Sequence, residues 1–165
     1  MWLVGMMGSG KTTVGREAAI RVGVAFYDTD RMVEEMARTT IDAIWDDVGE
    51  RGFRELERCV IATIPVSDFV AAAGGGAVLS VENRAHMSRG EPIVWLRASP
   101  GQLARRLQAD GSRPLLAHDL APEARLAALL EERSSLYSGV ATNLVDTDNR
   151  DVEDVICDVV DLWRR

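Results

Sequence analysis

The residues best suited to chemistry stand together near the start of the chain, in Gly5-Met6-Met7-Gly8-Ser9-Gly10-Lys11-Thr12. This stretch matches the pattern G-x-x-x-x-G-K-[ST] of a phosphate-binding loop at every fixed position. Lys11 is the only lysine in a chain that otherwise uses arginine for its permanent cations. An ammonium group is a compact point charge, which suits a position between two phosphates. The pattern therefore predicts a nucleotide-binding protein.

The motif assigns a task to each residue of the loop. Glycine has no side chain and tolerates positive φ, so the backbone N–H groups can point at a triphosphate beside the positive end of a helix dipole. We expect Lys11 to bridge the β- and γ-phosphates and the Thr12 hydroxyl to bind Mg²⁺. The alternative is a chance glycine-rich turn, which the apolar run before the motif and the helical pattern after it disfavour. The expected nucleotide-binding residues are Gly8, Ser9, Gly10, Lys11, Thr12 and Thr13.

Two carboxylates, Asp28 and Asp30, directly follow the second apolar run of the chain. Two acids beside a polyphosphate repel it unless Mg²⁺ lies between them or one acid faces a substrate hydroxyl. A structural alternative is that Asp30 is only the N-cap of a helix that begins at Arg31.

Arg133 lies on an apolar helical stripe, so it points in the same direction as its leucine neighbours. A buried guanidinium without an anion is costly, and we therefore expect it to have a partner. The alternative is a structural ion pair or a side chain that reaches back to solvent. The stripe consists of Leu126, Leu129, Leu130, Arg133 and Tyr137.

Arg54, Glu57 and Arg58 share one face of an expected helix over residues 49–64. Arg54 is suited to hold a carboxylate, with Glu57 orienting its guanidinium, whereas Arg58 is interpreted as a solvated surface charge. Further along, Gly74-Gly75-Gly76 follow the third apolar run. Three glycines there would let a small ligand lie against bare backbone, and a plain turn would rarely need all three.

These residues need an α/β framework to bring them together. Short apolar runs alternate with helical patterns, which predicts a parallel sheet with helices on both faces and ligands beyond the carboxyl ends of the strands. The polar segment over residues 110–121 separates two helices and is a candidate lid. The expected strands cover residues 2–4, 24–27, 69–72, 93–96 and 143–145. The expected helices cover residues 11–22, 31–37, 41–48, 49–64, 81–89, 100–109, 122–137 and 152–163.

Composition excludes several classes of protein. The net charge of −7 argues against a nucleic-acid surface, and no apolar run approaches the ~20 residues of a membrane span. The first strand begins at once, which leaves no room for a secretory leader. Cys59 and Cys157 lie in apolar helical patterns, so we expect buried free thiols in a reducing cytoplasm. A length of 165 residues fits one domain.

Taken together, these motifs resemble shikimate kinase from one end of the chain to the other. The phosphate-binding loop alone is shared by many kinases, but the whole set in this order is much more specific. The matching segments are Gly5–Thr12 with Thr13-Val14-Gly15-Arg16, Asp28-Thr29-Asp30, Phe53-Arg54-Glu55-Leu56-Glu57, Gly74-Gly75-Gly76-Ala77-Val78, Arg113-Pro114-Leu115-Leu116 and Arg133-Ser134-Ser135-Leu136-Tyr137.

The resemblance implies a three-layer P-loop kinase fold like that of the nucleoside monophosphate kinases, with a five-stranded parallel sheet. It implies a single domain over residues 1–165, with a lid at about 110–121 and a substrate-binding region at about 30–62. The implied reaction transfers the γ-phosphoryl group of ATP to the 3-hydroxyl of shikimate, in the pathway to chorismate and the aromatic amino acids. The implied protein is a cytoplasmic monomer that needs Mg²⁺.

Individual roles also follow from the resemblance. It implies that Asp30 contacts the ring hydroxyls and acts as the base, and that Asp28 helps Thr12 to hold Mg²⁺. Arg113 reaches from the lid to the phosphates and joins Lys11 and Asp30 as a catalytic residue. On the nucleotide, Arg106 stacks on adenine and Arg150 lies near the adenine loop. The residues implied to bind shikimate are Asp30, Arg54, Gly75, Gly76 and Arg133.

The chain departs from the family where Ala72 and Ala73 precede the glycines, because some members carry Ser or Thr there that can aid the metal. Two alternatives remain. Another small-molecule kinase, such as a gluconate kinase, would share the loop but would not bring Asp30, Arg54 and Arg133 together. A nucleotide-binding module without catalysis would be expected to lose Lys11, Thr12 or the acids, and the chain retains them.

Overall fold

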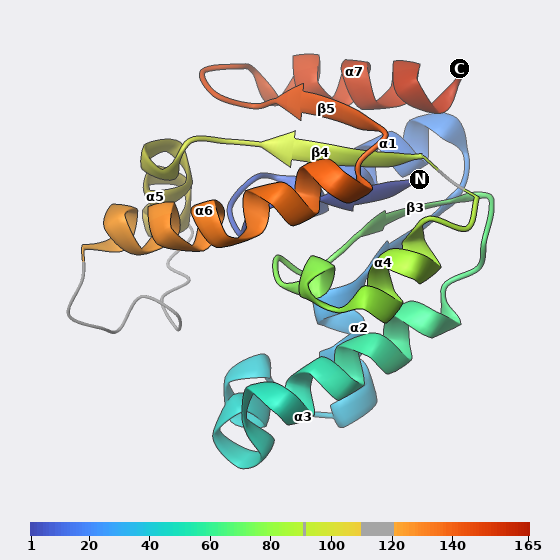
Figure 1. Ribbon diagram of the computed structural model, residues 1–165. Coiled ribbons are helices and arrows are strands. Elements are labelled where there is room, and N and C mark those ends of the chain that lie inside the picture. The colour runs from blue at the N-terminus through green and yellow to red at the C-terminus, as the bar shows by residue number, and fades with distance from the viewer. Residues whose placement is uncertain (91, 110–120) are drawn as a thin grey trace.

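Five parallel strands form a single sheet in the order β2-β3-β1-β4-β5, in a computed structural model that describes residues 1–90, 92–109 and 121–165 (Figure 1). All four neighbouring pairs are parallel, as the alternation of apolar runs and helices predicts. The strands point toward α5, so their carboxyl ends meet on that side of the molecule (Figure 1). The strands are β1 (Trp2–Val4), β2 (Ala25–Asp28), β3 (Phe69–Ala72), β4 (Ile93–Arg97) and β5 (Asn143–Asp146).

The helices follow the predicted pattern closely, and most differences are shifts of a few residues at the ends. A short 3₁₀ turn, η1 (Ala77–Leu79), follows the three glycines. The helices are α1 (Lys11–Val22), α2 (Thr29–Ala37), α3 (Ile41–Thr63), α4 (Val81–Met87), α5 (Pro100–Ala109), α6 (Pro122–Val140) and α7 (Val152–Trp163).

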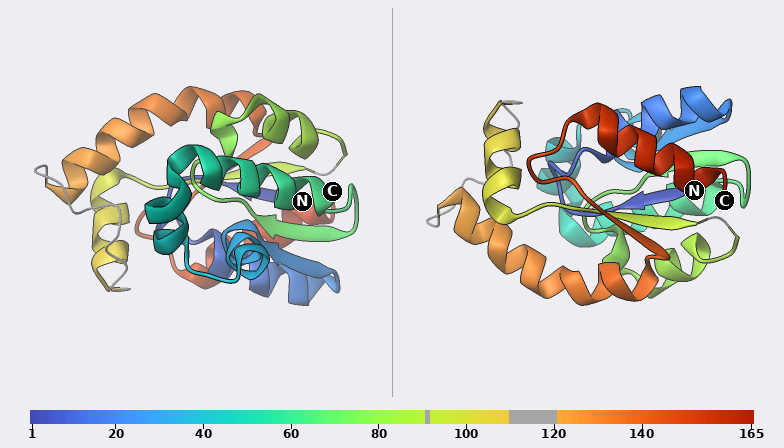
Figure 2. Two further views of the ribbon diagram at one scale, coloured as in Figure 1. Left: turned by 90° about the horizontal axis from the view of Figure 1, so that it is seen from below. Right: turned by 90° about the horizontal axis from the view of Figure 1, so that it is seen from above.

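Helices cover both faces of the sheet, which makes three layers (Figure 2). On one face, α1 and α7 bury Val14 and Val159 against alternate strand residues such as Leu3. On the other face, α3, α4, α5 and α6 pack against the complementary set, which includes Trp2 and Trp95. Burial of both faces explains why the strands read as short continuous apolar runs rather than alternating ones.

α3 bends at Gly49, where φ is 68° and the backbone leaves the helical region. Two helices were predicted to meet there, and the structure joins them into one element with a kink. Residues from α2 and both halves of α3, among them Val33, Ile44 and Phe53, form a small core apart from the sheet. This core holds α3 in place beside the glycine turn.

The prediction of buried thiols is wrong. Cys59 and Cys157 are free and exposed. Val60 and Ile61 take the inward positions beside Cys59, which leaves its thiol on the outer face of α3. Apolar neighbours in the sequence therefore did not show whether each cysteine side chain faces the core or the solvent.

None of the helices in the described ranges combines the length and apolar character needed to cross a bilayer.

Candidate active site

The phosphate-binding loop connects β1 to α1, as a loop of this class requires. Gly10 precedes the helix with φ at 93° and offers no side-chain cap, so the first N–H groups of α1 stay open toward the loop. Ser9 Oγ is buried, and no described residue is its hydrogen-bond partner. A cradle of open donors with an orphaned hydroxyl suits an anionic phosphate ligand.

Lys11 is buried beneath this loop, with a relative exposure of 8%. Its Nζ donates to the carbonyl oxygens of Gly5 and Met6, both at 2.9 Å. Burial lowers the pKa of the ammonium to about 8, and the negative charges of Asp30 and Asp28 only partly oppose that shift. Two neutral carbonyls do not balance a cation, so an anion at the loop would stabilise it.

Thr12 and Asp28 meet at the start of α1, where the Thr12 hydroxyl donates to Asp28 Oδ2 at 2.7 Å. Asp28 Oδ1 also accepts from the backbone N–H of Arg31 at 3.3 Å and so caps α2. The alternative that Asp30 is this cap is therefore wrong, because the helix begins two residues earlier than predicted. Paired hydroxyl and carboxylate oxygens are the kind of donors that Mg²⁺ accepts, and it often takes only one or two from a protein.

Asp30 and Glu57 approach the same point, the α-carbon of Gly74. A Cβ added to Gly74 would lie 2.5 Å from Asp30 Oδ1 and 2.6 Å from Glu57 Oε1. Burial raises the pKa of the Asp30 carboxyl, and Lys11 counteracts this. Burial likewise raises the pKa of Glu57, against the opposing effect of Arg54. The first glycine of the turn thus makes room for two desolvated carboxyls.

Arg54 is held from several sides. Its Nη1 donates to Glu57 Oε2 at 2.9 Å and its Nη2 to Glu50 Oε1 at 3.2 Å. The guanidinium carbon also lies 5.2 Å from the ring centre of Phe53 and 6.0 Å from that of Trp45.

The third glycine of the turn lies directly against this guanidinium. A Cβ on Gly76 would come within 2.3 Å of Arg54 Nη2. The predicted task of Glu57, to orient Arg54, agrees with this geometry.

Arg133 is buried in α6 at 8% relative exposure, as its stripe predicts. Its Nη1 donates to the carbonyl oxygen of Gly75 at 3.3 Å, and its Nε has no partner among the described residues. No described carboxylate forms an ion pair with it, which argues against the structural ion pair considered from the sequence. Asp30, Arg54 and Arg133 therefore surround the same three glycines.

The predicted adenine-side residues lie apart from this cluster. Arg106 donates to the Gly8 carbonyl at 3.4 Å and to Thr147 through Oγ1 at 3.0 Å and the carbonyl at 2.7 Å. It therefore ties the phosphate-binding loop to the segment after β5. Arg150 is engaged instead with Asp158 of α7, at 2.6 Å. Arg113 and all but the last residue of the predicted lid lie outside the described residues.

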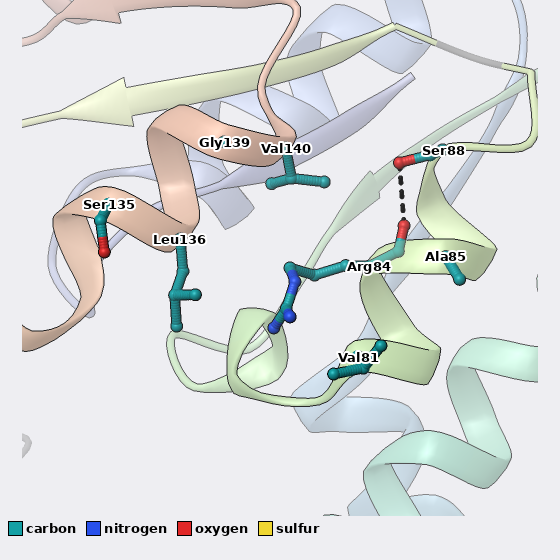
Figure 3. A pocket seen from close by; sticks show the side chains of 8 residues that line it. All are labelled: Val81, Arg84, Ala85, Ser88, Ser135, Leu136, Gly139 and Val140. Atoms are coloured by element: carbon teal, nitrogen blue, oxygen red, sulfur yellow. Dashed lines mark hydrogen bonds between the residues drawn. The ribbon is translucent and has the colours of Figure 1, made fainter.

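A separate groove of ≈ 340 Å³ runs between α4 and α6 (Figure 3). Leu136 of α6 and Val81 of α4 lie on opposite sides of it, and the Arg84 side chain extends from α4 into the space between them. Arg84 Nη1 donates to the carbonyl oxygens of Val78 and Leu79, at the end of η1. Arg84 thus supports the segment that follows the glycine turn. None of the predicted site residues that the structure describes lines this groove.

Two contacts of the site had no role in the sequence prediction. The Tyr137 hydroxyl donates to the Gly75 carbonyl, and the Trp45 ring lies over Arg54. The spacing of Tyr137, four residues after Arg133 on the same stripe, was the available signal for the first contact. Trp45 and Arg54 lie on opposite sides of the kink at Gly49. Regular helical spacing does not continue across the kink, so it could not predict the second contact.

A three-layer parallel fold with this loop, a buried lysine and a cluster of acids and arginines defines a P-loop kinase. The family model for shikimate kinase matches residues 7–163 of the chain. The chain is 44% identical to the shikimate kinase of Nitrosococcus oceani over 97% of its own length and 84% of that protein. It is 43% identical to the shikimate kinase of Symbiobacterium thermophilum, over 96% of this chain and 92% of that one.

Solved structures give the same result. Shikimate kinase from Acinetobacter baumannii in complex with shikimate has a TM-score of 0.90 and 36% identity, over 98% of this chain and 90% of that one. Shikimate kinase from Bacteroides thetaiotaomicron has a TM-score of 0.88 and 28% identity, over 99% and 97%. The chain belongs to the shikimate kinase family, and it is an ATP-dependent transferase that phosphorylates shikimate. Family membership decides against gluconate kinase and the non-catalytic module.

Proposed function

We propose that Asp30, Arg54 and Arg133 bind shikimate around the glycine turn, while the phosphate-binding loop holds ATP. The observation that carries this proposal is the approach of all three side chains to Gly74, Gly75 and Gly76, which belong to one turn at the carboxyl end of β3. Side chains from α2, α3 and α6 come together there, next to the loop that follows β1. Ligands of open parallel sheets bind at this end of the strands.

The chemistry of shikimate fits the charges of this cluster. Its single carboxylate requires cations, and the guanidinium groups of Arg54 and Arg133 offer planar donor pairs for it. Gly75 and Gly76 present backbone to the ring without side chains. Binding at this turn would orient the substrate before the reaction, which lowers the entropic part of the barrier.

Asp30 is the proposed base. The 3-hydroxyl oxygen forms a bond to the γ-phosphorus as the bond to the departing ADP oxygen breaks, and the hydroxyl proton passes to the Asp30 carboxylate. A raised carboxyl pKa brings this group closer to the operating pH, which favours proton transfer. The nearby ammonium of Lys11 opposes this rise in the pKa of Asp30 and so favours the charged carboxylate.

Charge on the transferred phosphoryl group would be neutralised by Lys11 and by Arg113. Thr12 and Asp28 would hold Mg²⁺, which supplies further neutralisation of the phosphates when it is bound. The remaining nucleotide contacts are assigned to the loop N–H groups of Gly8, Ser9, Gly10 and Thr13. Arg106 and Arg150 are assigned to the adenine side.

The cellular setting is proposed from composition. A chain with net charge −7 is not suited to a nucleic-acid partner, and we expect a monomer in the cytoplasm that acts on ATP and shikimate. Size-exclusion chromatography coupled to light scattering tests the oligomeric state, for which a mass near 18.1 kDa is expected.

The proposal is tested by ADP release with Mg-ATP and one acceptor at a time: shikimate, gluconate or a nucleoside monophosphate. Turnover is expected with shikimate alone. Arg54→Ala should then raise the KM for shikimate by about tenfold or more with little effect on the KM for ATP. Arg58→Ala is the matched control, because Arg58 is exposed on the same helix. Equal KM values for the two variants would remove Arg54 from the acceptor site.

A further inference from the structure

Tyr137 is fully buried in α6, and its hydroxyl donates to the carbonyl oxygen of Gly75 at 2.5 Å. The same carbonyl accepts the longer hydrogen bond of 3.3 Å from Arg133 Nη1. The two donors lie one helical turn apart. A carbonyl oxygen has two lone pairs, so this pair of donors uses both of them.

Trp95 and Met6 hold the Tyr137 side chain in place. It stacks on Trp95 with ring centres 5.5 Å apart and an interplanar angle of 26°. Its hydroxyl lies 3.7 Å from Met6 Sδ.

Gly75 itself rests against the phosphate-binding loop, because a Cβ there would lie 3.2 Å from the Met7 nitrogen. The phenol therefore sits where the glycine turn, the phosphate-binding loop and α6 meet. Burial raises its pKa to about 12, so the hydroxyl keeps its proton at neutral pH and remains a donor.

We propose that Tyr137 is a positioning residue for the acceptor: its hydroxyl satisfies the Gly75 carbonyl and so leaves the Arg133 guanidinium free to meet the substrate carboxylate. The proposal rests on the role of Arg133 given above. The short bond from Tyr137 is the stronger of the two, and the long one from Arg133 is easily exchanged for a charge-assisted bond. Without the hydroxyl, Arg133 would be the only donor to that carbonyl among the described residues, and breaking its bond on substrate binding would leave a polar group unsatisfied.

The test compares Tyr137→Phe with Tyr27→Phe. Each removes one phenolic oxygen, but the hydroxyl of Tyr27 makes no hydrogen bond within the described residues. In Tyr137→Phe we expect the KM for shikimate to rise by about fivefold to tenfold, with kcat within about twofold and the KM for ATP unchanged. Tyr27→Phe should match the parent protein in all three constants. An unchanged KM for shikimate in Tyr137→Phe overturns the proposal.

A double-mutant cycle with Arg133→Lys separates positioning from packing. If Tyr137 acts through Arg133, adding Tyr137→Phe to Arg133→Lys should raise the KM for shikimate by less than about twofold. Full additivity would mean that Tyr137 acts elsewhere, and thermal unfolding of each variant shows whether the fold is retained. If Arg133→Lys alone leaves the KM unchanged, the assigned role of Arg133 fails first, which is a distinct result.

Discussion

The two halves of the active site hold their cations in different ways. On the nucleotide side, Lys11 donates to two neutral carbonyls, and burial lowers its pKa. On the acceptor side, Arg54 is paired with Glu57 and Glu50. The nucleotide side therefore contains a cation that has no ion-pair partner among the described residues and that an incoming anion stabilises, whereas Arg54 on the acceptor side is already paired with carboxylates before the substrate arrives.

This difference separates two tasks. A desolvated and unbalanced ammonium gains most from contact with a polyphosphate, so it contributes to affinity and to neutralising transferred charge. A guanidinium that is already paired, such as that of Arg54, gains less from one more carboxylate, but its hydrogen bonds fix where it points. We therefore expect changes on the nucleotide side to affect turnover most, and changes around Arg54 to affect mainly the KM for shikimate.

Lys11→Met should have the largest effect. Removing the only cation that the loop supplies should lower kcat by about 10³-fold, because the developing charge loses its partner. Stopped-time ADP assays at saturating shikimate measure this, with circular dichroism as the check on folding. Retention of more than about a tenth of parental kcat would show that turnover does not depend on the Lys11 charge.

Asp30→Asn should lower kcat by about 10²-fold or more, because the amide cannot accept the hydroxyl proton. The affinity for ATP, measured by calorimetry, should remain within about twofold. Asp42→Asn provides the control, since Asp42 is an exposed acid at the start of α3. Near-normal turnover in Asp30→Asn would leave Asp30 without a role as base.

Gly76→Ala tests the acceptor side through the position of Arg54. The added methyl group would overlap the Arg54 guanidinium and force it to move, and φ of −101° at Gly76 gives no backbone strain. The KM for shikimate should rise by about tenfold, with a smaller change in kcat. Gly139→Ala is the matched control, because its Cβ meets nothing within 4 Å. Equal KM values would show that the position of Arg54 is not critical.

The smallest expected effect is the uptake of a fraction of a proton when ADP binds. With a pKa of about 8 in the free protein, Lys11 is largely charged at pH 6.5 and about half charged at pH 8. Bound phosphates favour the ammonium, so ADP binding at pH 8 should take up about half a proton from solution and almost none at pH 6.5. Calorimetry in buffers of different ionisation enthalpy measures this uptake, and Lys11→Arg should abolish it.

The sequence predicted the framework well because the framework depends on local patterns. The phosphate-binding loop is contiguous, and five elements, β1, β3, α1, α5 and α7, have the predicted bounds. For the acceptor cluster, the sequence predicted which residues take part but not how they contact one another. These contacts join α2, α3, α6 and the turn after β3, which are far apart in the sequence. Which oxygen of Glu57 would bind Arg54, or which donor would reach Gly75, depends on distances across the fold.

Other features escaped prediction for physical reasons that can be named. Asp28 rather than Asp30 caps the helix because α2 begins directly after β2, with no loop between them. The thiols are exposed because a small residue is tolerated on either face of a helix. Arg150 is paired with Asp158 through a turn that sequence spacing does not define.

The lone lysine has a practical consequence. Lys11 carries the only side-chain amine of the chain, and it lies beneath the phosphate-binding loop. Dyes, cross-linkers or resins that couple to side-chain amines therefore have no harmless anchoring point on the surface. The exposed sulfur atoms of Cys59 and Cys157 are the better handles for tethering or fluorescent tagging.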